Sequence, residues 1–258
     1  TWPEIETSQG KYDFSTIDAD IEKAAARGKR VFILMGTKSF SGDDKAVPAY
    51  LRTAEYGGGA FRIQIKRGGY GENAAIYNSR VADRLQALYQ ALGNRYNTDN
   101  NVEGVIFNET ALGMAVKPLT PAQQQAQFSN LARVNIAARN AFANSNMIQY
   151  MNSPMTFVPQ LWRSMQGNGI GVGGPDVFVN DKSLNKLLPS YASASGDVPI
   201  GVQVEGASYY SYKHNGPFAP PAVSTLFAFA RDRMKANYVF WVPDESEPHN
   251  PWPKVLNM

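Results

Sequence analysis

Cysteine is absent from this 258-residue sequence, which excludes disulfide bonds, zinc–cysteine sites, iron–sulfur clusters and cysteine nucleophiles. Histidine is scarce, and the two present, His214 and His249, lie far apart without a cluster of other ligand-type side chains. We therefore expect no metal site. Neither glycine-rich phosphate-binding pattern, GxGxxG or GxxxxGKS/T, follows a strand-like segment, so no nucleotide cofactor is expected.

Long apolar runs and a strong charge of one sign are missing as well. No run of aliphatic and aromatic residues exceeds five, the length of Val31–Met35, which is far shorter than the roughly 20 residues that a membrane helix needs. The 25 Lys and Arg residues nearly balance the 22 Asp and Glu residues, and no dense basic stripe occurs. The sequence thus favours neither a membrane nor a nucleic-acid partner.

The composition that remains is typical of a globular protein. Hydrophobic residues make up 43% of the chain, aromatic residues 12% and charged residues only 18%, which argues against a disordered tail. The length suits two smaller domains or one (β/α)8 barrel, which typically takes about 250 residues. We expect a single barrel domain over residues 1–258.

Helix-like and strand-like segments alternate along the chain, which predicts parallel βαβ units. The expected helices are 15–27, 79–93, 121–144, 158–166, 183–188 and 221–235. The expected strands are 30–35, 102–107, 147–151, 170–172, 199–204 and 238–242, short apolar runs of the kind found in sheets buried on both faces. Residues 41–78 interrupt this order, and the alternating segment 60–66 predicts a half-exposed hairpin arm in a Gly-rich insertion.

Alternating helices and strands fit an open parallel sheet as well as a barrel, and the polar residues favour the barrel. They follow the carboxyl ends of the expected strands, the end at which (β/α)8 barrels place their catalytic groups. These residues are Lys38, Asn108, Glu109, Asn152, Glu205 and Asp244.

Two of these residues are glutamates in matched positions. Glu109 ends the segment VEGVIFNE and Glu205 ends PIGVQVE, so each carboxylate directly follows a buried strand. A charge at the end of an apolar strand is costly unless it is paired, hydrated or used. For either residue alone, a turn cap or an ion pair explains the position. Together they favour the paired carboxyls that cleave a glycosidic bond.

Three stretches make the chain resemble clan A glycoside hydrolases, which are retaining (β/α)8 enzymes, and in particular the family-42-type β-galactosidases. The first stretch is WPEIETSQGKYDFSTIDADIEKAAARGKRVFI at 2–33, which is similar to a segment that follows strand 1 in that clan. The others are the pair Asn108–Glu109 after the fourth strand and Glu205 after the seventh.

The resemblance implies roles for these residues. Glu109 would be the acid/base, Glu205 the nucleophile, and Asn108 a contact to the sugar 2-hydroxyl. Trp241 matches the aromatic residue that often floors the sugar subsite. The chain starts at Thr1 without an initiator Met or an apolar leader, so we expect a mature or trimmed piece whose barrel lacks strand 1. Within that barrel, 30–35 takes the second place and no third strand is evident.

Further sugar contacts are expected from aromatic and amide side chains near strand ends. The strongest set is the aromatic cluster in the expected surface loop after Glu205, which holds Tyr209, Tyr210 and Tyr212 beside His214. The other candidates are Trp2, Lys38, Tyr150 and Asn152. A carbohydrate substrate also implies, through the resemblance, a secreted or periplasmic location.

Three alternatives remain open. The first is a barrel that binds carbohydrate without cleaving it, and the second is an inverting hydrolase with the same two carboxylates. The third is a Schiff-base enzyme, for which Lys38 is the candidate lysine. We expect the carboxyl groups of Glu109 and Glu205 to lie about 5–5.5 Å apart, as in retaining enzymes, whereas about 6.5–9.5 Å would indicate inversion.

Overall fold

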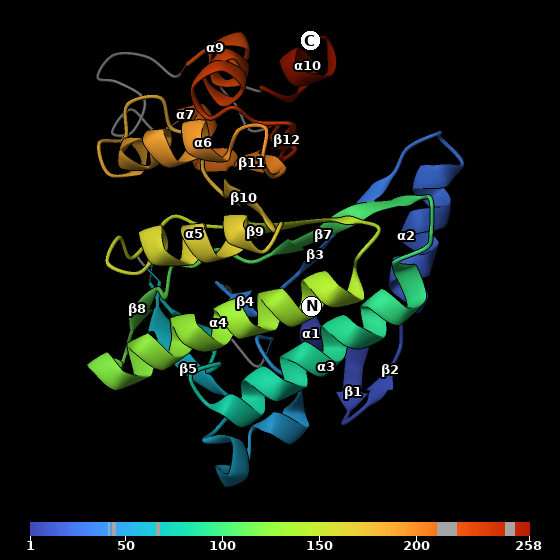
Figure 1. The fold of residues 1–258 in the computed structure, drawn as a ribbon, viewed down its shortest axis with the longest axis vertical. Helices are drawn as coiled ribbons and strands as arrows, with labels where there is room; N and C mark the ends of the chain where they lie inside the picture. Colours follow the sequence, from blue (N-terminus) through green and yellow to red (C-terminus); the bar gives the residue numbers. More distant parts are fainter. Residues whose placement is uncertain (41, 43–44, 66–67, 211–220, 246–250) are drawn as a thin grey trace. The chain divides into compact units, whose positions relative to one another are not determined.

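The computed structural model describes residues 1–258 except 41, 43–44, 66–67, 211–220 and 246–250 (Figure 1). The chain forms two compact units, Thr1–Met147 and Ile148–Met258. Each contains parallel strands that alternate with helices along the chain. The expected single domain over 1–258 stays a prediction.

The first unit opens with short elements that lead to a parallel strand. They are α1 (Trp2–Ile5), β1 (Glu6–Ser8), β2 (Lys11–Tyr12) and α2 (Ser15–Ala25). The amide of Ser15 binds the Asp13 carboxylate at the start of α2. After α2, Gly28 adopts a φ of +64°, a left-handed conformation that favours glycine and ends the helix as expected.

Strand β3 (Val31–Met35) pairs in parallel with β7 (Val102–Phe107), in register from Phe32 opposite Gly104 to Met35 opposite Phe107. This direct pairing corrects the expected strand order. Within the described residues the two are neighbours in the sheet, so if β7 is the fourth strand, as the resemblance implies, β3 is the third rather than the second. The expected burial of this strand on both faces is also wrong, because Leu34 is 46% exposed.

The insertion between β3 and β7 forms most of a small antiparallel sheet. Its strands, in spatial order, are β4 (Lys38–Ser39), β6 (Tyr70–Ala74), β5 (Ala60–Gln64) and β8 (Met114–Ala115). The single turns η1 (Ala49–Leu51) and η2 (Ala54–Tyr56) precede β5. The β5–β6 hairpin confirms the arm expected at 60–66, and Phe61 and Ile63 point from β5 into a small apolar core.

Two long helices complete the first unit and lie side by side, α3 (Ser79–Tyr96) and α4 (Pro121–Ala141) (Figure 1). The Asn78 side chain caps α3, and Thr120 caps α4, whose first residue is the expected Pro121. On α3, Tyr89 stacks on Phe107 of β7 with ring centroids 4.0 Å apart. This contact holds α3 against the strand that carries the predicted acid.

The second unit holds a parallel sheet in which β10 pairs with β9 and β11, and β11 pairs with β12. The strands are β9 (Asn146–Tyr150), which begins at the boundary of the units, β10 (Gly171–Gly174), β11 (Ile200–Val204) and β12 (Tyr238–Trp241). Gly173 and Gly201 allow β10 and β11 to approach, since a Cβ on Gly173 would lie 1.7 Å from the Gly201 carbonyl oxygen. All four strands are expected from the apolar runs.

Helices follow these strands. They are α5 (Val158–Gly167), the turn η3 (Leu184–Leu187) continued by α6 (Leu188–Ala194), α7 (Gly206–Tyr210), α9 (Val223–Ala228) continued by the π-helical η4 (Phe229–Arg233), and α10 (Trp252–Leu256). Helix α7 corrects one expectation: the start of the expected surface loop after Glu205 is helical. The described residues thus supply six parallel strands, and at least one helix lies between each of these strands and the next one along the chain.

Candidate active site

Glu109 sits in the first unit, two residues beyond the end of β7. This strand forms because Val102, Val105, Ile106 and Phe107 supply buried apolar side chains. Gly104 allows β7 to lie close to the backbone of Asn146, since a Cβ on Gly104 would lie 2.2 Å from the Asn146 carbonyl oxygen. The strand therefore delivers Asn108 and Glu109, both partly exposed, to its carboxyl end, as the sequence predicts.

Lys38 forms an ion pair with Glu109. Its ammonium Nζ lies 2.7 Å from Oε1 of Glu109 and also donates to the Ala111 carbonyl oxygen. The Lys38 side chain is 3% exposed and that of Glu109 is 19% exposed, so water screens this contact only weakly. The Lys38 amine is thus engaged by two oxygen atoms of the Glu109 loop, and a Schiff-base role for it stays an alternative.

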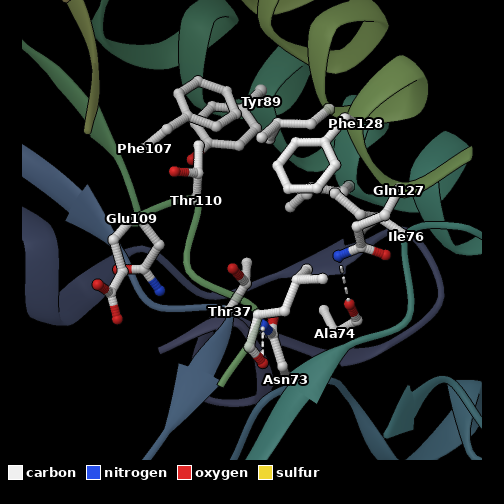
Figure 2. Close-up of a pocket in the computed structure, with 14 residues that line it drawn as sticks. Thr37, Asn73, Ala74, Ile76, Tyr89, Phe107, Glu109, Thr110, Gln127 and Phe128 are labelled. Atoms are coloured by element: carbon white, nitrogen blue, oxygen red, sulfur yellow. Dashed lines mark hydrogen bonds between the residues drawn. The ribbon is translucent and has the colours of Figure 1, made fainter. Parts of the chain in front are cut away.

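A cavity of about 40 Å³ lies beside Glu109 (Figure 2). Figure 2 shows the rings of Phe107, Tyr89 and Phe128 on one side, with Thr37 and Asn73 on the other. This volume suits water-sized molecules and is too small for a pyranose ring. This cavity is therefore not the sugar site, and a sugar would have to reach Glu109 from outside it.

The Glu109 loop is tied to the small antiparallel sheet. Asn73 of β6 donates its Nδ2 hydrogen bond to the Leu112 carbonyl oxygen over 3.3 Å. Gly113 adopts a φ of +77°, and Ile63 of β5 lies directly against it. The loop that presents the carboxylate is thus held by the insertion as well as by the barrel strand.

Glu205 sits in the second unit, directly after β11, and is partly exposed. Its backbone starts α7, where the amide of Glu205 donates to Ser208 Oγ over 3.2 Å and its carbonyl oxygen accepts from the Ser208 amide over 2.9 Å. A Cβ on Gly206 would lie 3.5 Å from Oδ2 of Asp244, which places this second carboxylate near the start of α7. The predicted nucleophile is therefore held by a short, capped turn.

The aromatic residues after Glu205 are only partly placed as the sequence predicts. Tyr209 is 3% exposed, donates its hydroxyl to the Val242 carbonyl oxygen over 3.0 Å and stacks on Trp241. Burial raises the pKa of its hydroxyl to about 12, and the nearby Asp244 adds to the shift. The prediction of Tyr209 as a surface sugar contact is wrong, because α7 turns its ring inward to support Trp241.

Tyr210 and Trp241 are partly exposed, and their role as sugar contacts stays a prediction. Tyr212 and His214 lie outside the described residues. Since Tyr209 supports one side of the Trp241 indole, with ring centroids 6.4 Å apart, a sugar would have to meet the rest of that ring.

At the end of β9, Tyr150 and Asn152 are largely buried. Asn152 donates its Nδ2 hydrogen bond to Oδ2 of Asp176 over 3.3 Å and accepts one from the Ser153 amide. The Tyr150 hydroxyl is buried without a partner among the described residues. Asn152 can thus orient Asp176, a strand-end carboxylate that sequence reasoning missed although its position after β10 matches those of Glu109 and Glu205.

Trp2 does not serve as a sugar platform, because it is fully buried. Its Nε1 donates to Oε2 of the fully buried Glu6 over 2.8 Å, and the Gly10 amide donates to Oε1 of Glu6 over 2.8 Å. Arg84 of α3 binds the same Oε1 and donates from Nε to the Tyr50 hydroxyl over 3.0 Å. The beginning of the stretch 2–33, which carried the resemblance, therefore takes part in a buried hydrogen-bond network of the first unit.

Comparison with solved structures confirms the fold. Neither a family model nor a curated protein sequence matches the chain. A β-galactosidase from Bacillus circulans sp. alkalophilus superposes with a TM-score of 0.63 at 12% identity, over 93% of this chain and 44% of its own. A β-galactosidase from the psychrophilic Marinomonas ef1 also gives 0.63, at 9% identity, over 97% of this chain and 50% of its own.

A psychrophilic glycoside hydrolase family 10 endo-β-1,4-xylanase gives a TM-score of 0.52 at 14% identity, over 96% of this chain and 78% of its own. The chain spans about half the length of the two β-galactosidases. It has the (β/α)8 barrel fold, with six of the eight strands in the described residues. The expected resemblance to clan A glycoside hydrolases is confirmed at the level of the fold.

Metal-binding clusters and membrane-spanning helices are both absent from the described residues. No group of three or more His, Asp or Glu side chains there could hold a metal ion. No helix in the same part of the chain combines the length and the apolar character that crossing a membrane requires.

Proposed function

We propose that the protein is a glycoside hydrolase of the retaining type, with Glu109 as acid/base and Glu205 as nucleophile. One observation carries the proposal: both carboxylates lie at the carboxyl ends of parallel strands, Glu109 two residues after β7 and Glu205 directly after β11, and both are partly exposed. The fold is shared with β-galactosidases and xylanases, which supports a carbohydrate as substrate.

The chemistry needs the two carboxyls in different protonation states. Glu109 must carry a proton to the departing glycosidic oxygen, while Glu205 must be ionised to attack the anomeric carbon. In the second step, Glu109 takes a proton from the water that releases the sugar from Glu205. The Lys38 ammonium, 2.7 Å from Oε1 of Glu109, would hold this carboxyl group in place during both steps.

The same ion pair favours a second candidate, a barrel that binds carbohydrate without cleaving it. In this geometry Oε1 of Glu109 is occupied by the Lys38 ammonium, so it is not available to a departing glycosidic oxygen unless the ammonium moves. In that case Glu109 and Lys38 would bind sugar hydroxyls as a charged pair. The two candidates differ in turnover, which one assay separates.

The test is hydrolysis of a panel of aryl β-glycosides and β-linked oligosaccharides by the wild-type chain and two variants. With Glu205→Gln we expect turnover to fall to background on every substrate. With Glu109→Gln we expect a loss of about 10²–10⁴-fold on oligosaccharides, the usual contribution of a general acid. The loss should be smaller on aryl glycosides with acidic leaving groups, which need no proton.

Glu103→Gln serves as the matched control and should keep wild-type turnover, because Glu103 lies on β7, the strand that leads to Glu109, but pairs with the exposed Arg30. A Glu205→Gln variant that keeps wild-type turnover would refute the nucleophile assignment. A wild-type chain that binds oligosaccharides in calorimetry but hydrolyses none would select the binding barrel instead.

A further inference from the structure

Phe40 places an exposed aromatic ring next to the Lys38–Glu109 pair. It directly follows β4 and is 59% exposed, more than any other aromatic side chain in the described part of the chain. The ammonium of Lys38 lies 5.3 Å from its ring centroid, and that ammonium lies 2.7 Å from the Glu109 carboxylate. A short chain of contacts therefore links Phe40 to the predicted acid.

The strand geometry explains why these side chains meet. Lys38 pairs with Asn73 of β6, and Ser39 pairs with Glu72. Side chains alternate along an extended chain, so Lys38 and Phe40 share one side while Ser39, 7% exposed, points to the other. The Ser39 hydroxyl donates to the Gly42 carbonyl oxygen over 3.2 Å, which fixes the backbone beside Phe40.

An exposed ring at this place has a specific chemical use. The face of a pyranose that carries C–H groups packs on aromatic rings, while its hydroxyls bind polar groups around it. A general acid touches the oxygen between the cleaved sugar and the leaving group. An exposed ring beside the acid, on its Lys38 side, is therefore within reach of a sugar next to the cleaved bond.

We propose that Phe40 is a platform for the sugar ring of the leaving group and so gives preference to oligosaccharides over substrates without a leaving sugar. This inference rests on the proposed function of Glu109. It assigns Phe40 to substrate binding and does not require it for the bond-breaking step.

Tyr70 provides a matched control on the same small sheet. It is 43% exposed, and the guanidinium of Arg62 lies 3.8 Å from its ring centroid. Tyr70 pairs with Gln64 of β5, three residues before Asn73 on β6, so it lies on the opposite face of the sheet from Asn73 and Lys38. A sugar at the Glu109 site would not touch it.

The experiment compares wild type, Phe40→Ala, Phe40→Trp and Tyr70→Ala on two kinds of substrate. These are β-1,4-linked galacto-, gluco- and xylo-tetraoses and the matching glycosyl fluorides, whose leaving group is a single atom. We expect Phe40→Ala to lower kcat/KM on the cleaved tetraose about tenfold, which corresponds to about 1.4 kcal/mol. Turnover of the glycosyl fluoride should stay within twofold, Phe40→Trp should restore the tetraose rate, and Tyr70→Ala should match wild type.

A second readout keeps this inference separate from the proposed function. Calorimetric titration of the same tetraoses measures binding whether or not the chain hydrolyses them. If wild type hydrolyses nothing but Phe40→Ala alone weakens binding about tenfold, the proposed hydrolysis fails while the Phe40 platform stands. Equal loss on the tetraose and the fluoride, equal behaviour of Phe40→Ala and Tyr70→Ala, or no tetraose binding by wild type would overturn the platform.

Discussion

At the scale of single residues, the buried carboxylate of Glu6 needs its partners. Glu6 is fully buried, and its oxygens bind Trp2 Nε1, the Gly10 amide and the Arg84 guanidinium, which is itself 18% exposed. A buried charge that loses its counter-charge keeps its desolvation cost without compensation. The network therefore depends on both members of the ion pair.

We predict that Arg84→Ala lowers the free energy of unfolding by about 3–5 kcal/mol, measured by urea denaturation with linear extrapolation. The control is Arg80→Ala on the same helix, where the pair with Glu55 is 61% and 59% exposed, and we expect a loss of about 1 kcal/mol or less. If Arg84→Ala fails to fold, the double variant Glu6→Gln with Arg84→Met should recover the fold by removing both charges. Equal losses for the two single variants would contradict this account.

Single residues differ in how far their positions can be predicted from the sequence. The strand-end positions of Glu109 and Glu205 could be predicted, because an acidic residue after an apolar run is a local feature of the sequence. The partner of Glu109, Lys38, could not be identified as such, because the contact joins two loops through strand pairing. Trp2 and Tyr209 were assigned to the surface wrongly, since their burial depends on Glu6, Arg84 and Trp241.

At the scale of elements, close strand approach in the second unit depends on glycine. A Cβ on Gly173 of β10 would lie 1.7 Å from the Gly201 carbonyl oxygen, a backbone atom that cannot move without shifting β11. Gly167 ends α5, and a Cβ placed on it would meet nothing within 4 Å. Replacing each of the two glycines by alanine therefore compares a crowded position with an open one.

We predict that Gly173→Ala lowers the free energy of unfolding by about 3 kcal/mol or more, as expected for overpacking against rigid backbone. Gly167→Ala should change it by less than about 1 kcal/mol, because alanine is tolerated well in a helix. Urea denaturation of both variants, with wild type beside them, measures the difference. A Gly173→Ala variant as stable as Gly167→Ala would show that β10 and β11 can separate at little cost.

Elements were more predictable than their order. Each expected parallel strand forms, because short apolar runs flanked by polar residues have few other ways to be buried. The prediction of β3 as the second barrel strand does not fit its direct pairing with β7, since a strand's partner cannot be read from the local sequence. The insertion that contains β5 and β6 stands where a third strand was expected. The helix α7 was missed because GASYY has no helical pattern of apolar residues and is too short to show one.

At the scale of the whole molecule, the proposed mechanism makes a stereochemical prediction. If Glu205 attacks the anomeric carbon and water then displaces it, two inversions leave the anomeric configuration unchanged. Proton NMR of a β-glycoside digest should then show the β-anomer as the first product, with the α-anomer appearing only by mutarotation. A first product of α configuration would mean a single displacement by water and a carboxyl separation of about 6.5–9.5 Å instead of about 5–5.5 Å. Glu109→Gln with added azide supplies an independent check, because a retaining enzyme without its acid/base should form the β-glycosyl azide, whereas an inverting enzyme has no covalent intermediate for azide to intercept.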